Sequence, residues 1–424
     1  MELKEICGGL KSAAGILALQ TASQKNSALK CVIDSINKNR AAILSANKID
    51  VENARKNGTS EPLIDRLSLN DKRLDAICEA VQIVIDHEDP VGKVEGGWAT
   101  PKGLQIKRVR VPLGVVAIIY ESRPNVTVDA FCLAYKSGNS ILLRGSSAAL
   151  ESNKVICAAI KEGLSACQDG VPQAIELLES QSHDDVDQIL NARGLIDIVL
   201  PRGGNKLIQH VVQNARIPVI ETGSGVCHLY VDDEGDLDMA VNIAENAKIQ
   251  RPGVCNAIEC ILVNKKIMDK FLPALEERFA GRVTFHADPD CIGALQSSAK
   301  KNGRPDCVVA AVPENYGFEF LDYDCVVKSV NDVEEAIEYI NAHNTKHSEC
   351  IVTNNRARAR LFQSKVDAAC VYVNASTRFT DGSEFGFGAE LGISTQKLHI
   401  RGPMGLEALT TTKYLIDGDG QIRG

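Results

Sequence analysis

The sequence lacks the features that would assign it to several common classes of protein. No CxxC pair occurs among its 14 cysteines, which argues against zinc ribbons and redox dithiols. The longest apolar run, Val111–Ile119, is far shorter than the roughly 18 residues that a membrane span requires. The opening residues, MELKEICGGL, contain two glutamates and no long apolar region, so we do not expect a signal peptide.

Positive charge is not in excess either. Lys and Arg total 47 against 55 Asp and Glu, which leaves a formal net charge of −8. Such a chain has no general attraction to nucleic acid or to an anionic membrane, and an anionic substrate would need locally placed donors. The length of 424 residues with 44% hydrophobic and 24% charged residues is typical of a globular protein with two or three domains. Reduced thiols in a chain of this size predict a cytoplasmic location.

Residues 1–95 are helical in character. Ala and Leu recur with charged residues on a 3.6-residue period through Ser27–Val51 and Asp71–His87, with Asn70 and Asp71 as N-cap candidates and Pro90 as a stop. No chemistry is evident in this part of the chain, so we expect a helical layer that covers a sheet.

The pattern changes around Gly96, and strands appear beyond it. Leu104–Val111 alternates apolar and basic residues as an edge strand does, and another subunit could extend a sheet there. Further along, apolar strands alternate with helical stretches, which predicts an α/β fold with a doubly wound parallel sheet. The expected strands are Gly114–Tyr120, Ser140–Leu143, Ala174–Leu178, Ile196–Leu200 and Ile217–Ile220, and the expected helices are Val126–Ser137, Ala149–Cys167, Asp184–Arg193 and Lys206–Ala215.

Polar turns follow four of these strands. Ligands of a doubly wound sheet bind beyond the carboxyl ends of its strands, so Asn125 could donate to an oxyanion and Arg144 could bind a ribose or its 2′-phosphate. The turn 201–205 precedes a helix whose N–H groups suit a phosphate or a nicotinamide. Each could instead be an ordinary turn or a solvated charge. The four turns are 121–125, 144–147, 201–205 and 221–225.

A second α/β unit begins near Val226. Its helix Leu237–Ile249 leads through Arg251, Pro252 and Gly253 to Cys255, ahead of a buried strand at Ile258. A cysteine at such a junction can face a cleft and act as a nucleophile, although most free cysteines only pack. Further strands are expected near Val283, Cys307, Cys325, Cys350 and Val371, with helices at Lys265–Phe279, Val333–Ala342 and Arg356–Lys365.

Other motifs are weaker. His228 replaces the third glycine of a GxGxxG that begins at Gly223, so a standard Rossmann fingerprint is rejected. His343 and His347 have the spacing of a zinc pair but lack its glutamate, and we expect them at the surface with no metal bound. No serine lies in a GxSxG setting, and no histidine is evidently paired with Cys255.

Several long stretches together resemble the aldehyde dehydrogenase superfamily, and most closely its branch that acts on a glutamyl phosphate. The resemblance extends over the chain from Gly96 onward, and the N-terminal helices agree in type. It is carried by VPLGVVAIIYESRPNVTVDA (111–130), IPVIETGSGVCHLYVD (217–232), KIQRPGVCNA (248–257), the stretch from VNASTRF to EALTT (373–411) and GDGQIR (418–423).

The resemblance implies roles for individual residues. Cys255 matches the nucleophile, Asn125 and the Cys255 backbone N–H match the oxyanion hole, and Glu221 matches a glutamate 34 positions before the cysteine. Cofactor-binding roles fall on Arg144, Ser146, Pro201, Arg202, Gly203, Gly204, Glu221, Gly223 and Glu319. Substrate-binding roles fall on Arg123, Arg251, Ser376 and Arg378. The sequence RGSSAA, which begins with the strand-end Arg144, departs from relatives, which usually have a second glycine and a glutamate after that arginine.

The implied fold has two doubly wound α/β domains and a small β flap for oligomerisation. The expected ranges are 1–95 and 114–225 for cofactor binding, 226–400 for catalysis, and 96–113 and 401–424 for the flap. The implied reaction is NADPH-dependent reduction of L-glutamyl 5-phosphate to the 5-semialdehyde and phosphate through a cysteine thioester, the second step of proline biosynthesis. The implied partners are a separate glutamate 5-kinase and further copies of the chain, in a homodimer or higher homo-oligomer.

Two alternatives remain. A hydrolytic aldehyde dehydrogenase would oxidise an aldehyde to an acid without needing phosphate. A catalytically silent scaffold would keep the fold and associate through its β ribbon, and its Cys255 would not be trapped by a substoichiometric thiol reagent.

Overall fold

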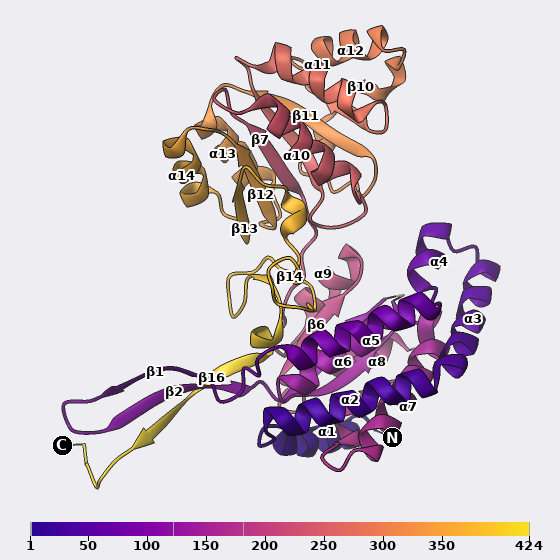
Figure 1. Cartoon of the computed structure of the whole chain (residues 1–424), viewed down its shortest axis with the longest axis vertical. Helices are drawn as coiled ribbons and strands as arrows, with labels where there is room; N and C mark the ends of the chain where they lie inside the picture. The colour runs from indigo at the N-terminus through magenta and orange to yellow at the C-terminus, as the bar shows by residue number, and fades with distance from the viewer. Residues whose placement is uncertain (1, 122, 181, 424) are drawn as a thin grey trace. The chain divides into compact units, whose positions relative to one another are not determined.

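A computed structural model describes residues 2–121, 123–180 and 182–423 (Figure 1). Its helices are α1 (Leu3–Leu17), α2 (Ala22–Lys38), α3 (Arg40–Lys56), α4 (Glu61–Leu67), α5 (Asp71–Asp86), α6 (Pro124–Lys136), α7 (Leu150–Ala166), α8 (His183–Leu190), α9 (Asn205–Asn214), α10 (Leu237–Ile249), α11 (Met268–Phe279), α12 (Ile292–Lys301), α13 (Val333–His343) and α14 (Arg356–Lys365).

The strands form four sheets. They are β1 (Val94–Ala99), β2 (Gln105–Pro112), β3 (Val115–Tyr120), β4 (Ser140–Arg144), β5 (Ile175–Leu177), β6 (Ile198–Arg202), β7 (Cys227–Val231), β8 (Ile258–Asn264), β9 (Thr284–Ala287), β10 (Val308–Ala310), β11 (Asp324–Val330), β12 (Ser348–Val352), β13 (Cys370–Val373), β14 (Ile393–Ser394), β15 (Gly402–Pro403) and β16 (Thr410–Asp417).

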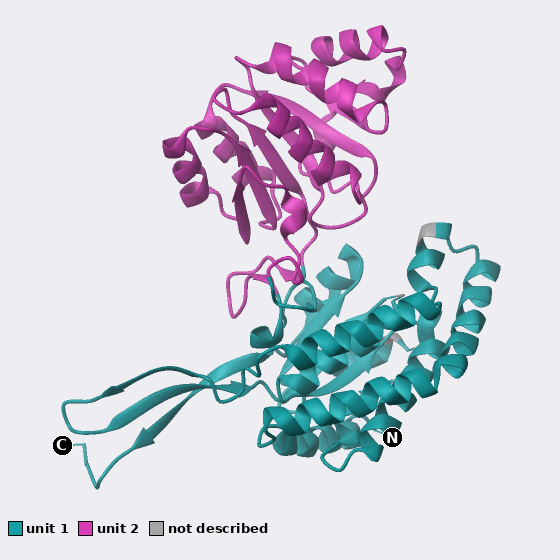
Figure 2. Ribbon diagram, in the orientation of Figure 1, with its two compact units in different colours: residues 1–222, 386–392, 404–424 teal, residues 223–385, 393–403 magenta. Residues whose placement is uncertain are grey.

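The chain divides into two compact units (Figure 2). The first contains residues 1–222, 386–392 and 404–424, and the second contains residues 223–385 and 393–403. The chain therefore returns to the first unit twice after leaving it at residue 222.

The N-terminal helices form as the periodicity predicts. Of the two N-cap candidates, Asn70 caps α5 by accepting the Arg73 N–H, and Asp71 is the first residue of the helix. The periodic stretch Ser27–Val51 falls in two helices, because the chain turns at Asn39 between α2 and α3. Asn residues compete with the helix for backbone hydrogen bonds, which favours such a break.

The sheet of the first unit is parallel, with strand order β5-β4-β3-β6. Alternate residues of β3, beginning at Val115, share a buried cluster with residues of α1, α8 and α9. Tyr120 faces the other way, and its hydroxyl is 2.7 Å from that of Thr127 on α6. Helices thus cover both faces of the sheet, as a doubly wound fold requires.

The stretch Ile217–Ile220, expected as a strand, makes only one bridge, between Val219 and Val199. Pro218 interrupts the stretch, and a proline has no N–H to donate to a ladder.

An antiparallel sheet of order β1-β2-β16 also belongs to the first unit. The C-terminal strand β16 pairs with β2 along its length, from Thr410 with Pro112 to Asp417 with Gln105. Trp98 of β1 packs edge-on against Tyr414 of β16, with ring centroids 6.1 Å apart. We call this three-stranded sheet the flap; Figure 1 shows it as a ribbon extending from the first unit.

The second unit contains a seven-stranded parallel sheet of order β10-β9-β11-β8-β7-β12-β13. One buried cluster joins the sheet to α10, α11 and α12, and a second joins its other face to α13 and α14. Its central strands β7 and β8 are wholly buried. This is the second doubly wound sheet that the sequence predicts.

Candidate active site

The residues singled out by the sequence fall into two groups, one in each unit. In the first unit they lie at the carboxyl ends of β3, β4 and β6. In the second they lie around the loop between α10 and β8. Ser122, in the turn 121–125, is outside the described residues.

The turn after β6 is held by a carboxylate that the sequence analysis did not assign. Glu121, which directly follows β3, accepts the backbone N–H of Gly204 at 2.8 Å. A Cβ on Gly203 would lie 2.5 Å from the same carboxylate oxygen, so a larger residue there would displace the Glu121 side chain. One of the N–H groups expected to face a ligand is therefore occupied by the protein. The first turn of α9 has no side-chain cap.

Asn125 is the second residue of α6 and is half-buried. Its Nδ2 donates to Oδ2 of Asp129 at 2.9 Å, which fixes the orientation of the amide. Burial raises the pKa of Asp129 to about 6, although Asn125 and Arg202 act in the opposite direction. Asp129 was not among the predicted site residues. Its position four residues after Asn125 on a helix was the signal that could have identified it.

Arg144 ends β4 and is half-buried. Its guanidinium donates to the backbone carbonyl groups of Gly145 and Ser182, at 3.3 and 3.4 Å. Ser146 is half-buried in the turn after β4, and Arg123 is half-buried directly before α6. All these residues follow neighbouring parallel strands, so they share one rim of the sheet.

The segment 386–392 also reaches this rim. A Cβ on Gly392 would lie 2.9 Å from the Arg202 guanidinium and 3.2 Å from the Thr222 methyl group. Thr222 in turn donates to the Pro201 carbonyl at 2.7 Å, next to the half-buried Glu221. A part of the C-terminal stretch is thus built into the edge of the first sheet.

Cys255 lies three residues before Ile258, the first residue of β8, and is half-buried. Its carbonyl oxygen accepts from the Cys227 thiol at 3.2 Å. A Cβ on Gly225 would lie only 1.5 Å from that carbonyl oxygen, so the chain before β7 runs against the backbone of Cys255. Glu319 anchors the same segment by accepting the Gly225 N–H at 2.6 Å. Gly223 also approaches closely, since a Cβ there would lie 2.5 Å from the Thr395 hydroxyl.

A second loop, residues 376–380, packs on the Cys255 loop. Asn256 donates to the Thr380 carbonyl at 2.9 Å, and Thr377 donates to the Asn256 carbonyl at 2.6 Å. Arg378 donates to the side chains of Asn256 and Gln250. The buried Ser376 accepts the Arg378 N–H. Sequence reasoning missed Asn256, although it adjoins the cysteine.

The Arg378 guanidinium lies close enough to Arg251 and to Cys255 for both groups to act on it electrostatically. Burial lowers the pKa of Arg378, and the charge of Arg251 acts in the same direction, whereas Asp381 and Cys255 act against it. The structure therefore brings together Arg251, Arg378 and Cys255 of the predicted residues. A cation near a thiol favours its thiolate form.

The two histidines with the spacing of a zinc pair differ in burial, and His343 is half-buried. His347 is fully buried, so the expectation of a surface pair is wrong for it. It directly precedes β12, and its Nδ1 is 2.8 Å from the Ser348 hydroxyl. Within the described residues no group of three or more His, Cys, Asp or Glu side chains could hold a metal ion.

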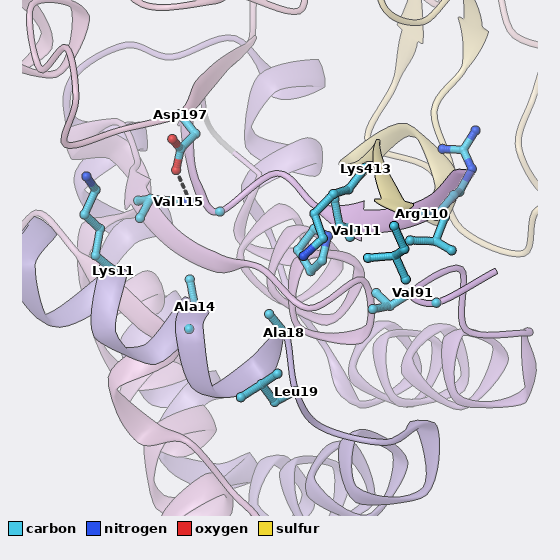
Figure 3. Close-up of a pocket in the computed structure, with 16 residues that line it drawn as sticks. Lys11, Ala14, Ala18, Leu19, Val91, Arg110, Val111, Val115, Asp197 and Lys413 are labelled. Carbon is cyan, nitrogen blue, oxygen red and sulfur yellow. Dashed lines mark hydrogen bonds between the residues drawn. The ribbon is translucent and has the colours of Figure 1, made fainter. Parts of the chain in front are cut away.

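A cavity of 630 Å³ lies elsewhere in the first unit. Figure 3 shows it lined by α1, by strands of the flap and by β3, with Lys11, Asp197 and Lys413 at its wall. None of the predicted site residues lines this cavity. No helix in the described ranges is long and apolar enough to cross a membrane.

Comparisons with known proteins identify the family of the chain. The sequence matches the profile of the aldehyde dehydrogenase family over residues 20–315 and 325–414. A gamma-glutamyl phosphate reductase from Treponema pallidum is 50% identical, with 99% of each chain covered. One from Clostridium novyi is 48% identical, with 97% of each chain covered. The crystal structure of gamma-glutamyl phosphate reductase from Thermotoga maritima matches with a TM-score of 0.94 at 46% identity and covers both chains completely. The chain therefore belongs to the aldehyde dehydrogenase family and, within it, groups with the gamma-glutamyl phosphate reductases.

Proposed function

We propose that the chain reduces L-glutamyl 5-phosphate to L-glutamate 5-semialdehyde and phosphate, with NADPH as the reductant, as the second step of proline biosynthesis. Relatives that share half of its residues over nearly its full length carry the name of this reaction. The structural observation that carries the proposal is a half-buried thiol, Cys255, at a loop where Arg251 and Arg378 supply positive charge.

Members of the aldehyde dehydrogenase family use nicotinamide cofactors. The donor set of the first unit fits such a cofactor. Although Glu121 occupies the Gly204 N–H, the first turn of α9 has no side-chain cap and follows two exposed glycines, and a helix N-terminus attracts phosphate groups. In our proposal the turn of Pro201, Arg202, Gly203 and Gly204 binds the nicotinamide dinucleotide together with Arg144, Ser146, Glu221, Gly223 and Glu319. When bound, NADPH supplies the hydride that reduces the thioester to the aldehyde level.

Cys255 is the proposed nucleophile. Its thiolate attacks the acyl carbon, a C–S bond forms, and the C–O bond to phosphate breaks, so that the carbonyl carbon is held as a thioester. Asn125 and the backbone N–H of Cys255 stabilise the transient oxyanion. After reduction the thiohemiacetal collapses, which releases the semialdehyde and restores the thiol.

Arginines are the proposed ligands of the anionic substrate. A protein of net charge −8 must supply fixed cations to bind a phosphate and a carboxylate. We assign this role to Arg123, Arg251 and Arg378, with Ser376 beside them. Phosphate is already a good leaving group, so its departure needs no strong acid.

The flap is the proposed oligomerisation surface. We propose that it joins copies of the chain into a homodimer or larger oligomer, because Trp98, Tyr414 and Ile416 expose half or more of their surface there.

We assign cofactor binding to the first unit apart from the flap, and catalysis to the second. A separate glutamate 5-kinase supplies the labile acyl phosphate, and the protein works in the cytoplasm, where its free thiols stay reduced.

One assay tests the reaction. NADP is reduced with the semialdehyde as substrate, with and without phosphate, by the wild type and by Cys255→Ala. The proposal expects reduction only when phosphate or arsenate is present, and none with Cys255→Ala. Unchanged reduction without phosphate would instead identify a hydrolytic aldehyde dehydrogenase, and no reduction by the wild type under any condition would favour a silent scaffold.

A further inference from the structure

A buried ion pair spans the loop that carries Cys255. Lys248 lies near the end of α10, which packs on β7 and β8 (Figure 1), and Glu259 is the second residue of β8. The Lys248 Nζ donates to Oε2 of Glu259 at 2.6 Å, and the side chains are 0% and 1% exposed. The pair therefore fixes the two ends of the connection 250–257 against each other.

The second oxygen of the Glu259 carboxylate has a different partner. It accepts the backbone N–H of Leu321 at 3.3 Å, and Leu321 has a φ of 57°. A leucine adopts this left-handed conformation only where its surroundings impose it. Two residues earlier, Glu319 accepts the Gly225 N–H. The carboxylate of Glu259 thus also holds the segment that carries Glu319.

Gly225 completes the connection to the reacting residue, because its backbone lies against the Cys255 carbonyl. Lys248 and Glu259 are therefore linked through Glu319 and Gly225 to the backbone of Cys255. A buried ion pair is costly to desolvate, and a well-packed apolar pair of similar volume often serves stability as well. We therefore attribute to the ion pair the orientation of two segments, the Cys255 loop and the segment that carries Glu319.

We propose that the Lys248–Glu259 pair is a positioning element, which holds the Cys255 loop and the Glu319 segment in a single arrangement and so aligns the thiol with the bound cofactor. The inference rests on the proposed roles of Cys255 and Glu319. Both members of the pair are buried and act through these residues rather than on the substrate.

The charge of Glu259 makes this element sensitive to pH. Burial raises the pKa of Glu259 to about 7, against the opposing effect of Lys248. The groups that face it are Lys248 on α10, Glu319, and the thiols of Cys227 on β7 and Cys325 on β11. Burial raises the pKa of both thiols, so they stay neutral. Below pH about 7, Glu259 gains a proton and its ionic hold on Lys248 weakens.

The test compares Glu259→Gln with Glu276→Gln. Glu276 is a matched control, because it is equally buried in the same unit and bonded to Arg304, Ser298 and Asn302, away from the Cys255 loop. Three quantities are measured: the rate at which iodoacetamide alkylates Cys255 with and without NADPH, the Kd of NADPH, and kcat with KM for the semialdehyde.

We expect Glu259→Gln to lower kcat by about 10- to 100-fold and to raise the Kd of NADPH by about tenfold, because a small misplacement of reacting groups has effects of this size. KM for the semialdehyde should change by less than about twofold, since the proposed substrate ligands are untouched. The difference between the alkylation rates of Cys255 with and without NADPH should also disappear. Glu276→Gln should match the wild type in all three measurements.

Glu259→Gln leaves the Lys248 charge buried, so a second variant is needed to separate the proposed effect from misfolding. Lys248→Met with Glu259→Leu removes both charges and should fold by circular dichroism. It should still show the losses in kcat and NADPH binding, without the ionisation near pH 7. Wild-type kinetics and alkylation in this folded double variant would overturn the inference, even with Cys255→Ala inactive. Full activity of Cys255→Ala would instead overturn the proposed function.

Discussion

At the scale of single residues, burial separates Cys255 from most other thiols of the chain. Cys132, Cys227 and Cys260 are buried, and burial raises the pKa of each well above its usual value. They are packing residues that stay protonated at neutral pH. Cys255 is half-buried at a loop that carries guanidinium groups. Its exposure and the cations of its loop, rather than its residue type, distinguish Cys255 from these packing thiols.

Substitution of Cys255 and of Glu221 should have unequal effects. Cys255→Ser should abolish reductase activity, because a serine hydroxyl is a far weaker nucleophile at neutral pH. Glu221→Gln should keep more activity, since activation of water is unwanted in an acyl-phosphate reduction. Steady-state kcat of both variants is the measurement, and equal losses would contradict the assignment.

At the scale of elements, the Cys255 loop depends on contact with the segment before β7. Gly225 allows this contact, because any Cβ there would meet the Cys255 backbone. Backbone, unlike the end of a flexible side chain, cannot move aside without shifting the loop. The position of the thiol therefore depends on a residue thirty positions away in the chain.

Gly225→Ala should displace this loop. We expect kcat to fall by about 100-fold or more and the free energy of unfolding to fall by about 1–3 kcal/mol from overpacking. Gly293→Ala, in α12 of the same unit, is the control, because nothing lies within 4 Å of the added Cβ. Its free energy of unfolding should be unchanged or higher by about 0.4–1 kcal/mol. The measurements are the free energy of unfolding from urea titration and kcat, each for both variants.

A second element, the segment 393–403, is tied to the second unit by charge. Asp367 lies 2.9 Å from Lys397 and 2.8 Å from Arg401. The Lys397 hydrogen bond, with a further contribution from Arg401, lowers the pKa of Asp367 to about 2. A carboxyl group whose pKa is lowered on folding stabilises the fold above its unfolded pKa and loses this contribution as the pH falls toward the folded value.

The stability difference between wild type and Asp367→Asn should therefore depend on pH. The wild type should be the more stable protein at pH 7, and the difference should shrink as the pH is lowered from about 5 toward about 3. Urea denaturation across this range is the measurement. A difference that is constant or grows in acid would show that the ion pairs do not stabilise the segment.

At the scale of the whole molecule, the chain crosses between its units several times. Residues 386–392 and 404–424 return to the first unit after 223–385 have formed the second. The flap needs both ends of this path, because β16 pairs with β2 across some 300 intervening positions. Such long-range pairing makes the flap dependent on the completed chain.

Charges placed on the flap should separate the copies of the proposed oligomer. Tyr414→Lys with Ile416→Lys adds two charges at side chains that are 53% and 57% exposed in a single chain. The melting temperature of the isolated chain should fall only slightly, through loss of the Trp98–Tyr414 ring contact. Light scattering coupled to gel filtration should report a smaller species than the wild type. An unchanged mass would show that copies do not meet through these residues.

Much of this architecture could be predicted from the sequence, because the signals for helices and strands lie in neighbouring residues. Helices α10 and α14 begin and end at the expected residues, and each begins directly after a side chain that caps it, Asp236 and Asn355 respectively. The stretch Ile217–Ile220 was expected as a strand from its apolar residues alone, but Pro218 removes a ladder donor. His347 was expected at the surface because its polar neighbours in the sequence gave no sign of the packing that buries it.

The sequence by itself determined the two doubly wound sheets, the cysteine at the element junction and the family, because periodicity and motifs are properties of neighbouring residues. Only the tertiary structure decided that Glu121 occupies an N–H of the turn after β6, that Arg378 lies at the Cys255 loop, and that Lys248 and Glu259 pair beneath it. These contacts join residues from separate elements, and which side chains meet depends on strand order and packing, which no local pattern encodes.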